Sequence, residues 1–223
     1  MEKDFWLERW EREEIGFHEG EVNAYLLQFW KELKLGSMDT VFVPLCGKSL
    51  DLKWLRDQGH PVLGVELSKI AVQAFFAENG YIPVHSMHDK FHRCEANGIC
   101  ILCGDFFDLS RKDLEAVNGV YDRASMIALP PDMRKRYVEH LVSILPAGVK
   151  ILLIAIDYSQ EEMAGPPFAL SSDEVQMLYG KYANIKQLAQ HDVLEKNPRF
   201  KSRGLTRMQE TVYLLTLLGG EKI

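Results

Sequence analysis

The sequence predicts an α/β fold, in which helices cover both faces of a doubly wound, mostly parallel sheet of seven strands. Short runs of β-branched and apolar residues, too short for buried helices, alternate with amphipathic stretches of helical period. Parallel strands joined by crossover helices require this alternation. Polar residues with binding chemistry follow several of the runs directly, where such sheets place their ligands. A length of 223 residues and 47% hydrophobic residues fit a single domain over residues 1–223.

The first strand–helix–strand unit has the clearest pattern. Residues 41–45 form an apolar run that ends at a turn, and residues 62–65 form a second run. Ser49 is the expected N-cap of the helix between them, and Gly59 is the expected glycine after its last turn. Gly47 falls in the turn after the first strand, where the missing Cβ leaves room for a ligand beside the backbone.

Glu66 ends the second strand, 19 residues after Gly47. In a βαβ unit this carboxylate lies beside the glycine turn and is able to accept hydrogen bonds from both hydroxyls of a ribose. A pyrophosphate needs the fuller pattern G-x-G-x-x-G, of which only Gly47 is present. The pair therefore favours a nucleoside without phosphates, and S-adenosylmethionine (SAM) is the common one. The alternative is an ordinary tight turn followed by a surface glutamate.

The N-terminal residues 4–35 have a helical pattern that is interrupted near residues 15–20. Trp6 and Trp10 are four positions apart and share one helix face, while charged residues occupy the other faces. Pattern alone slightly favours helices docked on the core. The alternative is a helical lid, residues 1–38, that closes over a bound ligand.

Residues 81–98 are expected to be mostly irregular. Within them, Asn97-Gly98 is a type I′ turn sequence, which predicts a hairpin between the runs at 91–96 and 99–103. The second arm is apolar enough to be the next strand of the sheet.

Three side chains with binding chemistry lie at or near later strand ends. Asp105 could accept a hydrogen bond from an adenine amino group while the Phe106 ring covers the base; the alternative is a turn with one buried phenylalanine. Arg123 lies within the apolar run 120–126, where an unpaired cation would be costly. It requires either an anionic ligand or a carboxylate such as Asp122 or Asp105.

The rest of the chain continues the alternation. Because the carboxyl ends of parallel strands meet at one edge, the residues singled out above converge on one crevice. The remaining expected elements are helices starting at Ser68, Pro131 and Ser172, strands at 149–156, 185–188 and 211–218, the last with an antiparallel neighbour, and a basic loop at 197–204.

The charge balance argues against a nucleic-acid substrate. The net charge is −6 and the pI is about 5.7, whereas phosphate binding needs a basic face. Apolar runs such as 151–156 are too short to span a bilayer, and the charged first 14 residues do not resemble a signal peptide. A cytoplasmic protein without nucleic-acid or membrane partners is expected, and it is expected to be a monomer.

The four cysteines are expected to be reduced thiols. Cys100 and Cys103 form a C-x-x-C pair, but in a strand they point to opposite faces and do not share a metal. Adding Cys94, His88 and His92 to this pair would make a possible zinc cluster, although buried apolar thiols are favoured over it. No metal is expected. The polar surface insertion favoured for this region contains His85, His88 and His92.

Several sequence blocks resemble the thiopurine S-methyltransferase family, in a bacterial form. They extend from about Trp6 to the last strand, and PLCGK and GPPF are the most unusual of them. The W-x-x-x-W pair followed by GFH near the N-terminus fits the same family. The matching blocks are FxPLCGKSLDxxWL, GHxVxGVELS, GDFFDL, YDRASMIAL and GPPF.

This resemblance implies a class I, Rossmann-like methyltransferase that uses SAM and no metal. It implies that Glu66 holds the ribose, that Phe106 covers the adenine, and that the N-terminal segment closes over the acceptor, so that Trp10 and Phe17 belong to a lid. The residues implied for the SAM site are Trp10, Leu45, Gly47, Glu66, Asp105, Phe106 and Arg123, and those implied for the acceptor site are Phe17, Phe168, Arg123 and Arg199.

The implied reaction transfers the methyl group of SAM to the sulfur of a thiopurine or a similar thiol, and bacterial relatives also suggest selenium or tellurium species. Such a transfer needs alignment of two ligands and exclusion of water, not a covalent nucleophile. The acceptor reacts as a thiolate. Arg123 and Arg199 are expected to stabilise this anion as catalytic residues. Arg203 rivals Arg199, because the loop 191–210 departs most from the family pattern.

Four other functions compete with this one. A nucleic-acid N-methyltransferase would carry N/D-P-P-F/Y/W after the fourth strand, where Leu129-Pro130-Pro131-Asp132 stands instead. An NAD-dependent oxidoreductase would need more glycines after the first strand. A methyltransferase of another small molecule, or a non-catalytic SAM-binding sensor, is compatible with the same motifs.

Overall fold

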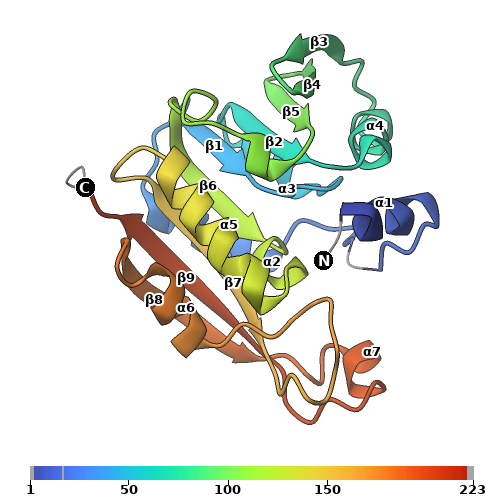
Figure 1. The fold of residues 1–223 in the computed structure, drawn as a ribbon, viewed down its shortest axis with the longest axis vertical. Helices are drawn as coiled ribbons and strands as arrows, with labels where there is room; N and C mark the ends of the chain where they lie inside the picture. The colour runs from blue at the N-terminus through green and yellow to red at the C-terminus, as the bar shows by residue number, and fades with distance from the viewer. Residues whose placement is uncertain (1–2, 17, 220–223) are drawn as a thin grey trace.

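The computed structural model, which describes residues 3–16 and 18–219, has the predicted doubly wound α/β architecture (Figure 1). Its strands are β1 (Thr40–Val43), β2 (Val62–Glu66), β3 (Val84–His88), β4 (Phe91–Ala96), β5 (Ile99–Cys103), β6 (Val117–Arg123), β7 (Lys150–Asp157), β8 (Ala183–Asp192) and β9 (Gln209–Leu217). They form one sheet in the order β3-β4-β5-β2-β1-β6-β7-β9-β8. In this order the neighbouring strands β5, β2, β1, β6 and β7 are parallel, and antiparallel strands extend both edges.

The described residues thus form a nine-stranded sheet instead of the predicted seven-stranded one. The expectation that residues 81–98 are mostly irregular is wrong, because β3, β4 and β5 form an antiparallel meander there. The turn at Asn97-Gly98 is confirmed, with φ of 53° and 77° as a type I′ turn requires. Strand β3 has a weak sequence signal because it is an exposed edge strand, which buries no face that would impose alternation.

Helices cover both faces of the sheet, and each face has its own hydrophobic core. On the face in front in Figure 1, α5 (Pro131–Ile144) and α6 (Ser172–Tyr179) pack through residues such as Tyr137 and Val175. On the opposite face, α2 (Ala24–Phe29), α3 (Asp51–Asp57) and α4 (Lys69–Glu78) pack through Leu26, Leu55 and Phe75. The remaining helices are α1 (Lys3–Glu11), α7 (Pro198–Lys201) and the short 3₁₀ turns Trp30–Leu33, Phe106–Asp108 and Met126–Ala128.

Three of the five predicted helix-end residues are confirmed. Pro131 is the first residue of α5, Ser68 caps α4 by accepting a hydrogen bond from the Ala71 N–H at 3.3 Å, and Gly59 follows α3 with a φ of 101°. The other two N-caps were predicted one residue away from their observed positions, although the Ser49 hydroxyl still accepts a hydrogen bond from the first N–H of α3 at 3.2 Å. The observed caps are Leu50 for α3 and Ser171 for α6, instead of Ser49 and Ser172.

The order of the strands reverses at β1. The chain runs from β1 to β2 on one side, and it later crosses to β6 on the other side. Loops that leave β1 and β6 therefore diverge, and they leave a crevice at the carboxyl ends of these strands. Among the described helices, none combines the length and the apolar composition that crossing a membrane requires.

A buried carboxylate lies at the end of β6. Asp122 is fully buried, and its Oδ2 accepts a hydrogen bond from the Tyr137 hydroxyl at 2.7 Å. Its Oδ1 has no hydrogen-bond partner in the part of the chain that the structure describes. Burial raises the pKa of Asp122 to about 6, and the polar groups of Tyr137 and Ser125 act in the opposite direction.

We expect Asp122→Asn to remove a pH-dependent loss of stability. An unfolded aspartate has a pKa of about 3.9, so the folded state binds this proton more tightly. The stabilising protonated form is present at acid pH and is lost as the pH rises through about 6. Between about pH 3 and pH 7, the free energy of unfolding of the variant should gain up to about 3 kcal/mol relative to the wild type.

Urea denaturation of both proteins at a series of pH values measures this difference. Other carboxylates titrate equally in the two proteins, so their effects cancel in the comparison. Two stability profiles that stay parallel from acid to neutral pH would show that Asp122 carries no such penalty.

Candidate active site

A cavity of about 1180 Å³ opens at the carboxyl ends of the central strands. It is bounded by the loops after β1, β2, β5 and β6, by the N-terminal segment, and by α7. Phe168 is not among the lining residues, and Phe17 lies outside the described residues. The predicted site residues that line the cavity are Trp10, Leu45, Gly47, Glu66, Asp105, Phe106, Arg123 and Arg199, and Arg203 lines it as well.

The turn after β1 has an unusual backbone. Leu45 and Gly47 both lie in the left-handed region, with φ of 45° and 54°. A Cβ on Gly47 would lie 3.4 Å from the indole of Trp10, so the glycine lets the lid helix α1 pack closely on this turn. A leucine in this region costs on the order of 1–3 kcal/mol and persists where surrounding contacts impose it, often at a functional site.

Glu66 binds the same turn through hydrogen bonds from the backbone. Its Oε2 accepts from the Gly47 N–H at 2.9 Å, and its Oε1 accepts from the Ser68 N–H at 2.7 Å. Burial raises the pKa of Glu66, while these backbone donors act to lower it. Each carboxylate oxygen has a second lone pair, so the group is able to accept two further hydrogen bonds, as a ribose diol would supply.

Asp105 and Phe106 lie at the end of β5, on the other side of the crevice. Asp105 accepts a hydrogen bond from the Phe107 N–H at 3.0 Å, and Lys3 forms an ion pair with it at 2.5 Å. The Phe106 ring is almost fully buried and stacks on Tyr137 with the ring centroids 4.7 Å apart. Phe106 is therefore part of the core as well as of the cavity wall, and only part of its ring surface is available to a base.

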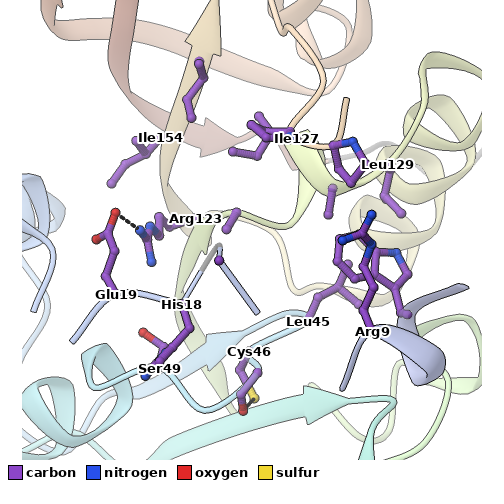
Figure 2. A pocket seen from close by; sticks show the side chains of 18 of the residues that line it. Arg9, His18, Glu19, Leu45, Cys46, Ser49, Arg123, Ile127, Leu129 and Ile154 are labelled. Carbon is purple, nitrogen blue, oxygen red and sulfur yellow. Dashed lines mark hydrogen bonds and ion pairs between the residues drawn. The ribbon is translucent and has the colours of Figure 1, made fainter. Parts of the chain in front are cut away.

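Arg123 forms an ion pair with a residue that the sequence analysis did not name. Its Nη2 lies 2.5 Å from Oε1 of Glu19, in the N-terminal segment (Figure 2). The alternatives named from the sequence, Asp122 and Asp105, are not its ion-pair partners. Burial disfavours the charge on Arg123, but the nearby Tyr121 and acidic groups outweigh it, so its pKa is raised. The guanidinium is therefore a fixed positive charge in the cavity wall.

Several other cavity residues had no local signal in the sequence. Asp51 accepts hydrogen bonds from the Tyr121 hydroxyl and from the Asn23 N–H, both at 2.9 Å, and so joins β6 to the N-terminal segment. Glu210 also lines the cavity, and burial raises its pKa. The one available clue was the rule that a buried arginine needs a carboxylate. That rule predicted an acidic partner for Arg123 without identifying it. Glu19, the partner, and Glu210, a further nearby acid, are both distant from Arg123 in the sequence.

The basic loop contains the short helix α7. Nη1 of Arg199 donates a hydrogen bond to the Gly16 carbonyl at 2.6 Å, which joins α7 to the N-terminal segment. Arg203 lines the same cavity. Arg199 and Arg203 thus add two guanidinium groups to a cavity wall that also contains Arg9, Arg123 and Arg136.

The GPPF segment contributes prolines, and not its phenylalanine, to the cavity. The Phe168 N–H donates to the Ile127 carbonyl at 2.7 Å, and the Tyr158 hydroxyl donates to the Pro167 carbonyl at 2.5 Å. These bonds fix the loop with Pro166 and Pro167 facing the cavity.

The residues at the β1 and β2 ends fit SAM. The turn at Gly47 leaves its backbone accessible to a ligand, Glu66 offers two free acceptor positions for a ribose, and the cavity has room for a nucleoside and a second small molecule. Only one glycine is present in the turn, which matches a ligand without a pyrophosphate.

Solved structures with the same fold include methyltransferases. A SAM-dependent methyltransferase from Anabaena variabilis superposes with a TM-score of 0.66 at 14% identity, covering 96% of this chain and 94% of that chain. A 1,6-didemethyltoxoflavin-N1-methyltransferase from Burkholderia thailandensis, solved with S-adenosylhomocysteine, gives a TM-score of 0.64 at 12% identity over 97% and 87% of the two chains. At these identities the likeness establishes the fold.

Sequence relatives are much closer. Thiopurine S-methyltransferase from Nitrosospira multiformis is 57% identical over 215 residues, which are 96% of this chain and 98% of the relative. The enzyme of the same name from Pseudomonas paraeruginosa is 52% identical over 96% and 99% of the two chains. Residues 1–217 match the family model described as thiopurine S-methyltransferase. The chain therefore belongs to the thiopurine S-methyltransferase family, whose members use SAM.

Proposed function

We propose that this protein is an S-methyltransferase, which transfers the methyl group of SAM to the sulfur of a small thiol such as a thiopurine. The observation that carries the proposal is a single cavity that combines a nucleoside-binding carboxylate, Glu66, with a buried cation, Arg123. Membership of a family named for this reaction supports it.

The residues around β1 and β2 bind the donor in this proposal. Bound SAM supplies an electrophilic methyl group on its sulfonium. Glu66 accepts hydrogen bonds from the two ribose hydroxyls of SAM, and the turn of Leu45 and Gly47 contacts the methionine part of SAM. Asp105 and the accessible edge of Phe106 bind the adenine. Trp10 packs over Gly47 and closes the site on the solvent side.

Arg123 binds the acceptor and stabilises the thiolate form of its sulfur. Its present partner, Glu19, has a side chain that is 54% exposed, so Glu19 is able to move into solvent when an anionic sulfur takes its place. Arg199 of α7, or Arg203 just after this helix, supports the same anion. These groups orient the sulfur for in-line attack, while the N-terminal segment excludes water.

The remaining parts of the proposal concern the protein as a whole. Residues 1–223 act as one domain, with residues 1–38 as its lid and with Phe17 near the acceptor. The protein acts as a cytoplasmic monomer on small molecules and does not bind nucleic acids or membranes, which agrees with its net charge of −6. Selenium and tellurium species are further acceptors, since a site for a soft sulfur anion also suits them.

The decisive experiment follows methyl transfer from labelled SAM to 6-mercaptopurine, with selenite and a plain aryl thiol in parallel. Turnover of the thiopurine is expected, because the acceptor is a thiol that Arg123 stabilises as its anion. Binding of SAM without turnover of any acceptor would instead favour a SAM-binding sensor.

Glu66→Gln should weaken SAM binding by roughly ten- to a hundredfold, because charge-assisted hydrogen bonds are lost and an amide NH₂ faces a backbone donor. The maximal rate at saturating SAM should change little. Isothermal titration of SAM and steady-state kinetics measure the two effects. Glu115→Gln, an exposed glutamate outside the cavity, is the matched control. Equal SAM affinity in the Glu66 variant and the control would exclude the ribose-binding role.

Arg123→Lys should lower kcat/KM for the acceptor by about a hundredfold and leave KM for SAM unchanged. The reason is that a single ammonium replaces the several coplanar N–H donors of the guanidinium. The exposed Arg111→Lys is the matched control, and it should behave as the wild type. Parallel assays of Arg199→Ala and Arg203→Ala identify which arginine of the basic loop supports the acceptor. An acceptor kcat/KM that does not respond to Arg123→Lys would refute this role for Arg123.

A further inference from the structure

Three side chains that commonly bind metals gather on the β3–β4 hairpin. Their ligand atoms, one each from His85, His92 and Cys94, lie within 4.8 Å of one another. His85 and Cys94 are direct partners across the antiparallel ladder, and His92 is two residues before Cys94. All three therefore lie on the same face of the sheet. None of them lines the cavity, so the cluster is separate from the proposed active site.

The two sulfur–nitrogen distances in this cluster match the coordination of zinc. Sγ of Cys94 lies 3.4 Å from Nδ1 of His85 and 3.5 Å from Nδ1 of His92. With Zn–S near 2.3 Å and Zn–N near 2.05 Å, a tetrahedral ion holds these atom types about 3.6 Å apart. The two imidazole rings stack nearly parallel, with an interplanar angle of 14° and centroids 5.1 Å apart. Both rings thus direct the same nitrogen toward one sulfur.

Without a metal, these contacts are two hydrogen bonds: the Cys94 thiol donates to one Nδ1 and accepts from the other, protonated Nδ1. Thiols are weak donors and weak acceptors, so neither bond is strong. A cation bound between the three groups satisfies both nitrogens and the sulfur together.

The kinds of ligand select a borderline-soft ion. The cluster offers one thiol sulfur and two imidazole nitrogens, and it contains no carboxylate, which Mg²⁺ and Ca²⁺ would require. Met87 and Cys103 lie opposite His92 on its two neighbouring strands, so further sulfur atoms border this face. Cys94 is buried and His85 is exposed, so the site has a protected sulfur and an entry path from solvent.

We propose that His85, His92 and Cys94 bind one Zn²⁺ ion through their Nδ1, Nδ1 and Sγ atoms, with water in the fourth position. Cys94 loses its thiol proton to solvent when the ion binds, and no redox step is involved. The ion crosslinks edge strand β3 to β4 and stabilises the hairpin. This site takes no part in methyl transfer, and its existence does not depend on the function proposed above.

The cluster shares His92 and Cys94 with the zinc cluster considered from the sequence, which also contained His88, Cys100 and Cys103 and lacked His85. His88, which was counted there, instead places its Nε2 2.6 Å from a carboxylate oxygen of Asp113. His88 is three residues from His85, and in a strand this odd spacing puts it on the opposite face. Only the pairing of β3 with β4 brings His85 beside Cys94.

The test is a competition titration, in which the full-length protein withdraws Zn²⁺ from a chromophoric chelator. The wild type should bind one equivalent, and excess Mg²⁺ should not displace it. His85→Ala and Cys94→Ser should each weaken binding by more than about tenfold, the loss that a change outside the metal ligands can already cause. The matched controls His88→Ala and Cys100→Ser, on the opposite face of the same meander, should bind as the wild type.

Two further readouts separate a metal site from a folding effect. Co²⁺ should give a thiolate-to-metal charge-transfer band that Cys94→Ser abolishes, and Zn²⁺ should raise the melting temperature of the wild type but not that of His85→Ala. His85 is exposed, so its variant should remain folded and retain SAM binding. Absence of one-equivalent binding by the wild type, or an equal loss in the two control variants, would overturn the proposal.

Discussion

The hydrogen bonds of one buried carboxylate organise the active-site edge of the sheet. Glu66, at the end of β2, accepts backbone N–H groups from the turn after β1 and from the start of α4. These bonds keep the left-handed turn of Leu45 and Gly47 in register with β2, and Trp10 packs on that turn. A buried charge is tolerated here because two backbone donors stabilise it. The same carboxylate retains acceptor capacity for a ligand, so a structural role and a binding role coincide in one residue.

The N-terminal segment is joined to the rest of the molecule by polar contacts at both ends of the cavity. Lys3 pairs with Asp105 at one end, and Glu19 pairs with Arg123 at the other. The side chains of Lys3 and Glu19 are 61% and 54% exposed, so screening by water limits each ion pair to about 1 kcal/mol or less. Contacts of this strength hold the segment over the cavity without locking it, as the lid role proposed above requires.

The two edges of the sheet have different roles in this picture. Near the edge formed by β8 and β9, Glu210 of β9 and helix α7 line the cavity. The opposite edge ends in β3, an exposed strand that pairs only with β4 among the described strands. Exposed edges are liable to pair with other chains, and a metal crosslink between β3 and β4 would restrain this one. The proposed zinc site therefore has a structural rationale that is independent of catalysis.

Local patterns in the sequence determined the parallel core of the fold and half of the site. Residues 41–45 and 62–65 have the apolar composition of buried parallel strands, and Gly47, Glu66 and Asp105 follow strand ends by position alone. Only the tertiary structure decided which acid pairs with Arg123, which histidine joins Cys94, and that Pro167 instead of Phe168 faces the cavity. Strand ends follow from short-range periodicity, whereas partners across the cavity and across the hairpin depend on contacts between distant residues, which no local pattern contains.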